Sequence, residues 1–215
     1  MQIGVLGTGV VGQTIGTALA RRGHAVRLGS RTANNTKALD WVASNGERAS
    51  QGTFSDAATF AELVFNCTSG TASLEALRSA GIGNLAGKVL VDVANPLDFS
   101  HGMPPTLAIC NTDSLAEQIQ AEFPATKVVK ALNTMSAPVM VEPSLVPGEH
   151  DVFMSGNDPQ AKAQVRELLQ EFGWRNIVDL GDITTARGTE MVLPIWLRLW
   201  GAFKTPLFNF RIARQ

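Results

Sequence analysis

Residues 2–12 read QIGVLGTGVVG, and this stretch decides the fold. Its first half is a short apolar run that predicts a buried strand. The glycines that follow, Gly7, Gly9 and Gly12, have the G-x-G-x-x-G spacing, and helical spacing begins at Val10. A strand, a glycine-rich turn and a helix in this order are typical of a dinucleotide-binding βαβ unit.

Each glycine of this turn has its own physical role in such a unit. Gly7 permits the tight turn, Gly9 lets a pyrophosphate approach the backbone, and Gly12 lets the helix pack closely on the strand. The free N–H groups at the helix start, at Val10 and Val11, then face the phosphates. A glycine-rich turn without a ligand is the alternative, but the strand and helix on either side favour a binding site.

Strands and helices alternate along the rest of the chain. After the first strand we expect further strands at residues 25–28, 63–67, 88–93, 127–132, 151–155 and 177–179. We expect helices at residues 10–22, 35–44, 72–80, 115–122 and 159–172, and a last one from about residue 185. Largely apolar strands separated by helices predict an α/β fold, a Rossmann-type doubly wound and mainly parallel sheet with right-handed crossovers.

Two stretches interrupt this alternation, residues 95–111 and residues 134–150, and we expect both to be irregular. The first is rich in proline and is typical of a long functional loop. We expect residues 1–135 to form an NADP-binding Rossmann domain. Residues 136–215 are expected to be a small C-terminal α/β extension that packs on the same sheet and lines the substrate cleft.

The loop after the second strand indicates which dinucleotide is bound. An NAD-binding domain usually carries Asp or Glu about 20 residues past the glycines, where the carboxylate bonds the ribose 2'-hydroxyl. Here the strand ends in LGSRT, without an acid. Ser30 and Arg31 can instead donate to a 2'-phosphate, and the guanidinium fork of Arg31 suits phosphate well. Lys37 is a candidate second cation for this phosphate, and Thr8 is a candidate hydroxyl donor. The alternative for Arg31 and Lys37 is that both are solvated surface charges.

Composition limits the class of protein. The chain has 215 residues, a net charge of −1 and 45% hydrophobic residues, so we expect no nucleic-acid partner. Cys67 and Cys110 have neither disulfide-framework nor metal spacing, and we expect no metal. The first residues do not resemble a signal peptide, and the apolar stretch 191–203 is too short to span a bilayer. We therefore expect a cytoplasmic protein without a membrane partner.

Residues 4–31, GVLGTGVVGQTIGTALARRGHAVRLGSR, resemble the NADPH-dependent reductases of the deazaflavin coenzyme F420 and the similar cytoplasmic domain of the STEAP metalloreductases. The resemblance continues through residues 92–96 (DVANP) and 130–134 (KALNT) and covers about the first two thirds of the chain. The last third has a similar order of elements but a different sequence.

The resemblance implies roles for residues at the ends of the later strands. Ligands of open parallel sheets lie beyond these carboxyl ends. The resemblance places Thr68, Ser69, Ala94, Asn95 and Pro96 along the pyrophosphate and the nicotinamide ribose. It places Asn133 and Thr134 beside the nicotinamide and the acceptor, which makes them the candidate catalytic residues.

The leading functional hypothesis is an NADP(H)-dependent oxidoreductase that transfers a hydride between NADPH and F420 or a flavin-like acceptor, a small-molecule partner. Hydride transfer between stacked rings depends on position and water exclusion more than on an acid or base. An enzyme of the beta-hydroxyacid or imine-reductase group, using Lys130 and Asn133, is one alternative. A non-catalytic NADP(H)-binding redox sensor is another.

The histidines are weaker candidates. His24 lies in a helix-to-strand turn and is expected to be structural, whereas His101 and His150 lie in the irregular stretches. The C-terminal segment is rich in aromatic residues, namely Trp196, Trp200, Phe203, Phe208 and Phe210. A homodimer contact and simple packing over the sheet are equally good explanations of this segment.

Overall fold

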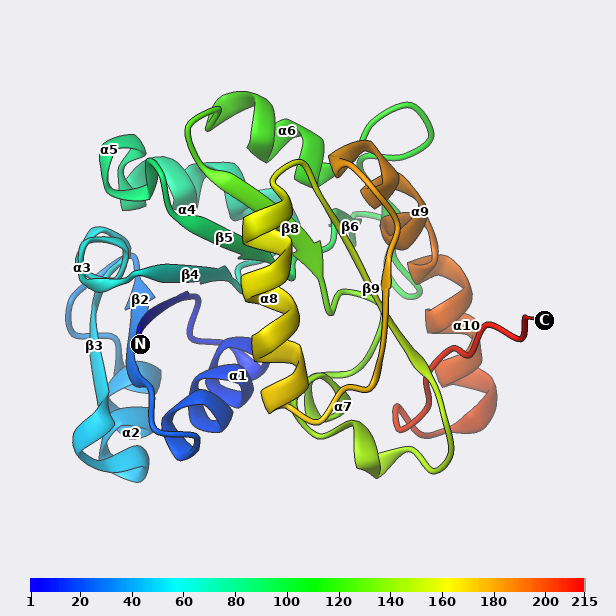
Figure 1. Cartoon of the computed structure of the whole chain (residues 1–215), viewed down its shortest axis with the longest axis horizontal. Helices are drawn as coiled ribbons and strands as arrows, with labels where there is room; N and C mark the ends of the chain where they lie inside the picture. Colours follow the sequence, from blue (N-terminus) through cyan, green and yellow to red (C-terminus); the bar gives the residue numbers. More distant parts are fainter. Residues whose placement is uncertain (215) are drawn as a thin grey trace.

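The computed structural model describes residues 1–214 and is built around one eight-stranded sheet (Figure 1). The strand order is β10-β9-β8-β5-β4-β1-β2-β3. Every neighbouring pair is parallel except β8 and β9, which are antiparallel. The strands of this sheet are β1 (Gln2–Leu6), β2 (Ala25–Ser30), β3 (Ala49–Thr53), β4 (Leu63–Asn66), β5 (Val89–Asp92), β8 (Lys127–Ala131), β9 (Asp151–Gly156) and β10 (Asn176–Asp179).

Helices cover both faces of the sheet, as the alternating order predicts. The α-helices are α1 (Val10–Arg21), α2 (Thr36–Asn45), α3 (Phe54–Phe60), α4 (Ser73–Ala80), α5 (Ile82–Leu85), α6 (Leu115–Glu122), α7 (Ala137–Val141), α8 (Pro159–Glu171), α9 (Ala186–Met191) and α10 (Leu193–Phe203). Short 3-10 helices are η1 (Gly46–Arg48), η2 (Gly70–Ala72), η3 (Pro143–Leu145) and η4 (Ile183–Thr185). Within residues 1–214, no helix combines the length and the apolar character that crossing a bilayer requires.

The core is divided between the two faces because side chains alternate along a strand. In β4, Leu63 and Phe65 point into the layer formed with α1, α2, α7 and α8. Val64, between them, points into the other layer, with α3, α4 and α6. Both layers are apolar, which explains why the central strands read as continuous hydrophobic runs.

The predicted α/β fold and its mainly parallel sheet are confirmed, and the local differences include the following. β3 completes one edge of the sheet, although its sequence ASQGT has too little apolar character to predict a strand. The expected irregular stretch at 134–150 is wrong in part, because the short helix α7 begins at Ala137, with Pro138 in its first turn. The stretch 95–111 pairs only the two-residue strands β6 (Leu97–Asp98) and β7 (Thr106–Leu107) and otherwise remains a loop.

The C-terminal third extends the same sheet. β9 pairs antiparallel with β8, and β10 pairs parallel with β9. α9 and α10 then lie beyond the carboxyl ends of the central strands, on the right of Figure 1. This arrangement brings residues from the chain's end to the edge of the sheet where ligands of such folds bind.

Candidate functional site

The three glycines of the turn between β1 and α1 differ in their surroundings: two are tightly packed and one faces open space. Gly7 has φ +119°, and a Cβ there would lie 2.6 Å from the Cys67 carbonyl oxygen. A Cβ on Gly12 would lie 2.2 Å from the carbonyl oxygen of Gly7. At Gly9, by contrast, a Cβ would meet nothing within 4 Å. Gly7 and Gly12 are therefore needed for close packing, whereas the absence of a side chain at Gly9 leaves the backbone open to a ligand.

The start of α1 faces this free surface. Gly9 is the N-cap residue of α1, and it has no side chain that could bond the first N–H groups. Val10 is exposed, and Val11 packs partly against the core. The N–H groups of a first helical turn have no partner within the helix and carry a partial positive charge. This turn therefore offers a site for an anion such as a phosphate.

A cavity of about 690 Å³ opens beside the turn, between the end of β2 and helix α4. It brings together seven of the residues predicted from the sequence: Gly7, Thr8, Gly9, Ser30, Arg31, Thr68 and Ser69. Its remaining lining is Thr32, Asn35, Phe54, Cys67, Ala72, Glu75, Ala76 and Ser79, none of which the sequence reasoning placed at the cofactor. The cavity has the mixed apolar and polar lining expected of a small-molecule site.

The two clamp residues after β2 differ in their surroundings. Arg31 is exposed and lines the cavity, so its guanidinium can reach a ligand there. Ser30 is buried, and its hydroxyl donates to the carbonyl oxygen of Thr32 at 2.5 Å. Ser30 thus shapes the turn that presents Arg31. Lys37 lies elsewhere, in a groove with Gln13, Thr17 and Arg21, and the structure does not bring it to this cavity.

The loops after β4 and β5 pack tightly against each other. A Cβ on Gly70 would lie 2.0 Å from the carbonyl oxygen of Asn95, so only glycine fits. The hydroxyl of Thr68 donates to the side-chain oxygen of Asn66 at 2.7 Å, which fixes the β4 end. In the β5 loop, Ala94 and Pro96 are buried and Asn95 is partly exposed.

The two candidate catalytic residues, Asn133 and Thr134, lie buried after β8. Asn133 and Asn95 are reciprocally paired, since each side-chain amide donates to an oxygen of the other residue at 2.9 Å. Asn133 also donates to the carbonyl oxygen of Thr189 at 3.1 Å. Leu132 has φ +65°, an uncommon conformation for a leucine, and it redirects the chain into this contact. Asn133 therefore holds strand ends together, and both donors of its side-chain amide are used within the described residues.

Lys130 lies inside the protein, with 1% of its side chain exposed. Its Nζ is 2.8 Å from carboxylate oxygens of both Asp92 and Glu190. This argues against the role in substrate handling that the imine-reductase alternative gives to Lys130. Sequence reasoning missed Asp92 and Glu190, although an acid that ends an apolar strand, as in VLVD, is a signal of a buried polar contact.

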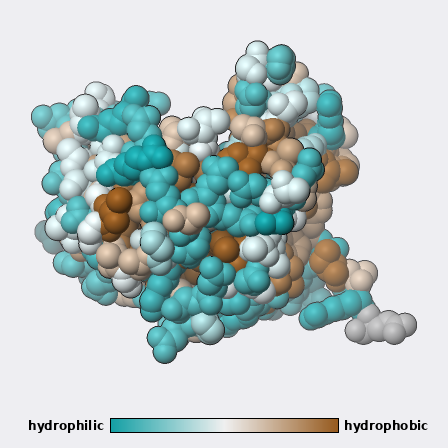
Figure 2. Space-filling view, turned by 90° about the horizontal axis from the view of Figure 1, so that it is seen from above, coloured by the Kyte–Doolittle hydropathy of each residue, from teal (hydrophilic) through white to brown (hydrophobic). Residues whose placement is uncertain are grey.

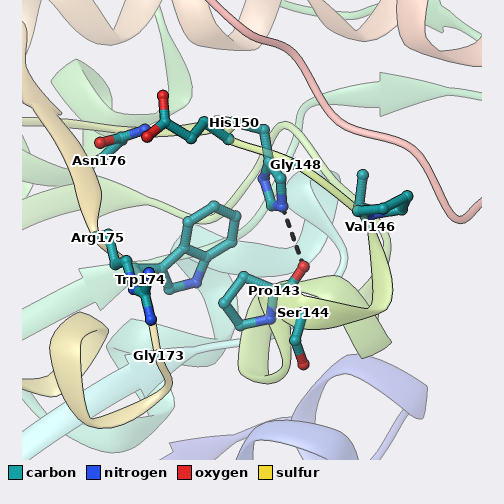
Figure 3. A pocket seen from close by; sticks show the side chains of 11 residues that line it. Pro143, Ser144, Val146, Gly148, His150, Gly173, Trp174, Arg175 and Asn176 are labelled. Carbon is teal, nitrogen blue, oxygen red and sulfur yellow. Dashed lines mark hydrogen bonds between the residues drawn. The ribbon is translucent and has the colours of Figure 1, made fainter.

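A second cavity, of about 360 Å³, lies between η3 and the start of β10 (Figure 3). His150 lines it, but both ring nitrogens are engaged. Nε2 bonds the carbonyl oxygen of Pro143 at 3.0 Å, drawn as the dashed line in Figure 3, and Nδ1 is 2.9 Å from the Asn209 amide. The ring also packs edge-on against Trp174. His150 is thus a buried structural residue.

His24 and Cys67 are not catalytic candidates either. His24 bonds Glu171 at 2.8 Å, which confirms its predicted structural role. Cys67 lines the larger cavity, but burial raises the pKa of its thiol, so the reactive thiolate is disfavoured. In the described residues no cluster of His, Cys, Asp or Glu can hold a metal ion.

Comparisons with known proteins point to one family. The family model for coenzyme F420-dependent NADP oxidoreductases matches residues 2–96. A crystal structure from Arthrobacter sp. FB24, of a candidate F420-dependent NADP reductase, is 56% identical, with a TM-score of 0.96 over 100% of both chains. The chain belongs to the coenzyme F420-dependent NADP oxidoreductase family. Its fold is therefore that of an NADP-dependent oxidoreductase family, as the sequence indicated.

Two further relatives share part of their length with this chain. Metalloreductase STEAP3 of Rattus norvegicus is 30% identical over 205 residues, 95% of this chain and 38% of that protein. F420-dependent NADP reductase of Methanocaldococcus jannaschii is 29% identical over 130 residues, 60% of this chain and 58% of that protein. The chain thus spans less than two thirds of the length of both relatives.

Proposed function

We propose that this protein binds NADP(H) in the 690 Å³ cavity and transfers a hydride between NADPH and coenzyme F420 or a flavin-like acceptor. The observation that carries the proposal is the union, in one cavity, of the glycine turn and an exposed arginine after β2. The first suits a pyrophosphate and the second a 2'-phosphate. Membership of the F420-dependent family supports the same assignment.

The residues present fit the dinucleotide. The open space at Gly9 and the uncapped N–H groups of α1 suit the pyrophosphate. Arg31 suits the 2'-phosphate, with the hydroxyl of Thr8 close to the turn. Lys37 is not part of this assignment, because it lines a different groove.

The nicotinamide would supply the hydride, and the protein's own part is to position it and to exclude water. The loops at Ala94–Pro96 and Asn133–Thr134 are the strand ends suited to this task. They are largely buried and joined by the Asn95–Asn133 pair. An acid or base is not needed for transfer between two rings, so the use of the Asn133 amide in structural hydrogen bonds agrees with this chemistry.

The experiment is a single-turnover measurement. Protein loaded with NADPH is mixed with oxidised F420, FMN, FAD or a ferric chelate, and the loss of NADPH absorbance is followed. The proposal expects rapid oxidation with F420 or a flavin. Oxidation by the ferric chelate alone would move the function towards that of the metalloreductase relatives. Tight binding of NADPH with turnover of none of the acceptors would instead support a redox sensor.

We also propose a homodimer in which α10 provides the contact. Trp196 is buried against Phe208, at 5.2 Å between ring centroids, so part of the aromatic segment packs within the chain. Ile195, Trp200 and Phe203 remain exposed by 54%, 41% and 56%. Figure 2 shows apolar surface on the half of the molecule that carries α9 and α10, and also on the opposite half. Exposed apolar area of this kind often marks a protein contact.

Light scattering after size-exclusion chromatography tests the homodimer. The proposal expects a dimer for the unmodified chain and a monomer for the Trp200→Ser, Phe203→Ser double variant. Leu39→Ser, which removes an exposed apolar side chain from α2, is the control and should remain dimeric. A monomeric unmodified chain would refute the contact.

A further inference from the structure

A row of buried polar residues crosses the sheet at the end of three strands. Asn66 on β4, Asp92 on β5 and Lys130 on β8 are Cα partners in the sheet register, so their side chains share one face. At most 1% of any of them is exposed. The side-chain amide of Asn66 donates to Asp92 at 2.8 Å, and Nζ of Lys130 donates to the other oxygen of Asp92 at 2.8 Å.

The row continues into the C-terminal third through Glu190 on α9. Lys130 Nζ also lies 2.8 Å from Oε1 of Glu190 and donates to the backbone carbonyl of Ala94. Glu190 in turn accepts the N–H groups of Leu115 and Ala116, at 2.8 and 3.2 Å, at the start of α6. One ammonium and one carboxylate thus connect β5, β8, α6 and α9.

The charge arrangement is costly for stability alone. Burial raises the pKa of the Glu190 carboxyl, against the attraction of Lys130. Burial also opposes the charge of Lys130, but Asp92 and Glu190 outweigh it and raise the pKa of its ammonium. Replacing such a buried cluster with well-packed apolar residues is often neutral or stabilising. Its presence here suggests a purpose beyond holding the fold.

The location of the cluster indicates that purpose. The Ala94 carbonyl that Lys130 holds belongs to the same loop as Asn95, which pairs with Asn133. Asn133 also contacts Thr189, the neighbour of Glu190 on α9. Both loops of the proposed nicotinamide site are therefore fixed by the cluster or by its immediate neighbours, without any cluster residue lining the cofactor cavity.

We propose that Lys130 and Glu190 are positioning residues, which hold the loops at Ala94–Pro96 and Asn133 in the geometry that hydride transfer requires. This inference rests on the proposed function. Displacement of a reacting group by 1 Å can lower a rate by about 100-fold. Lys130 and Glu190 bond Asp92, Ala94, Leu115, Ala116 and each other, and none of these residues lines the 690 Å³ cavity, where the proposal places the phosphates and the adenosine. The rate of transfer therefore depends on these residues, whereas binding of the adenosine half does not.

The experiment compares Glu190→Gln and Lys130→Met with the unmodified chain. Gln keeps the shape of Glu190 but replaces one of the oxygens that accept from Lys130, Leu115 and Ala116 by a donor. The measurements are kcat and KM for oxidation of NADPH by whichever acceptor the single-turnover measurement finds, and the Kd of 2',5'-ADP, which carries only the phosphorylated adenosine half. Matched controls are Glu171→Gln, beside His24, and Lys127→Met, at the opposite end of β8.

We expect kcat to fall about tenfold or more in both variants, with the Kd of 2',5'-ADP within about twofold of the unmodified value. The controls should keep both values. If Lys130→Met does not fold, Glu190→Gln decides alone. An unchanged kcat in folded Glu190→Gln, or an equal loss of kcat and of 2',5'-ADP binding, would overturn the inference while leaving the proposed function intact. An unmodified chain that binds no NADPH, or that binds it but passes its hydride to none of the acceptors, would overturn both.

Discussion

Changing Arg31 to Ala isolates the residue that gives the site its preference for a phosphorylated dinucleotide. Arg31 is exposed at the rim of the 690 Å³ cavity, so its removal should leave the folding free energy almost unchanged. A hydrogen bond to a charged group contributes about 1.5–3 kcal/mol. Since about 1.4 kcal/mol is a factor of ten in Kd, the variant should bind NADPH about ten- to 150-fold more weakly.

NADH, which lacks the 2'-phosphate, provides the comparison. Its Kd should change by no more than about twofold in Arg31→Ala, because no phosphate faces the missing guanidinium. Fluorescence titration of NADPH and NADH measures both constants at one ionic strength, since salt screens an exposed charge. The loss of NADPH affinity should also shrink as salt is raised.

Lys37→Ala is the matched control, since it removes another cation near the start of α2. Lys37 lines the groove with Gln13 and Arg21 and not the cofactor cavity, so the ratio of the two Kd values should stay at the unmodified value. Equal weakening of NADPH and NADH by Arg31→Ala would refute the 2'-phosphate clamp. So would a Lys37→Ala variant that loses as much preference for NADPH as Arg31→Ala.

The local geometry at Gly9, Ser114 and Glu190 determines how substitutions there should change binding and stability. Gly9→Ala should have an unfolding free energy within about 1 kcal/mol of the unmodified chain, because its Cβ meets nothing within 4 Å. NADPH titration of this variant should nevertheless show binding weakened by about tenfold or more. Gly12→Ala, whose Cβ would lie 2.2 Å from a carbonyl oxygen, should instead unfold at a clearly lower urea concentration. Ser114→Ala should lower the unfolding free energy by about 1 kcal/mol, since the buried Ser114 hydroxyl caps α6 by accepting the Glu117 N–H at 3.2 Å, and an unchanged urea midpoint would contradict this. Burial raises the pKa of Glu190 above the 4.5 of an unperturbed glutamate, so the folded protein keeps a proton that the unfolded chain has already lost. The unfolding free energy should therefore decline as pH rises from 4.5 through the folded pKa. In Glu190→Gln, the unfolding free energy measured with urea should depend less on pH over that range.

The sequence by itself determined the parts of this protein that depend on neighbouring residues. The G-x-G-x-x-G turn, the absence of an acid after the second strand and the apolar strands are local patterns, and they were enough to predict the Rossmann-type sheet and a preference for NADP. Gly9, Arg31 and Ser69 meet in one cavity because parallel strands bring their carboxyl ends to one edge. Ser30 is nearby too, but its hydroxyl serves the turn.

Tertiary structure alone decided what depends on contacts between distant segments. Lys37 is close to Arg31 in sequence, yet its position on α2 places it in another groove, beside Gln13. Lys130 has the sequence context of a substrate-handling lysine, but α9, much later in the chain, folds back and places Glu190 against it. No local pattern encodes such a pairing, because it exists only once the sheet has formed and the C-terminal third has packed across its strand ends.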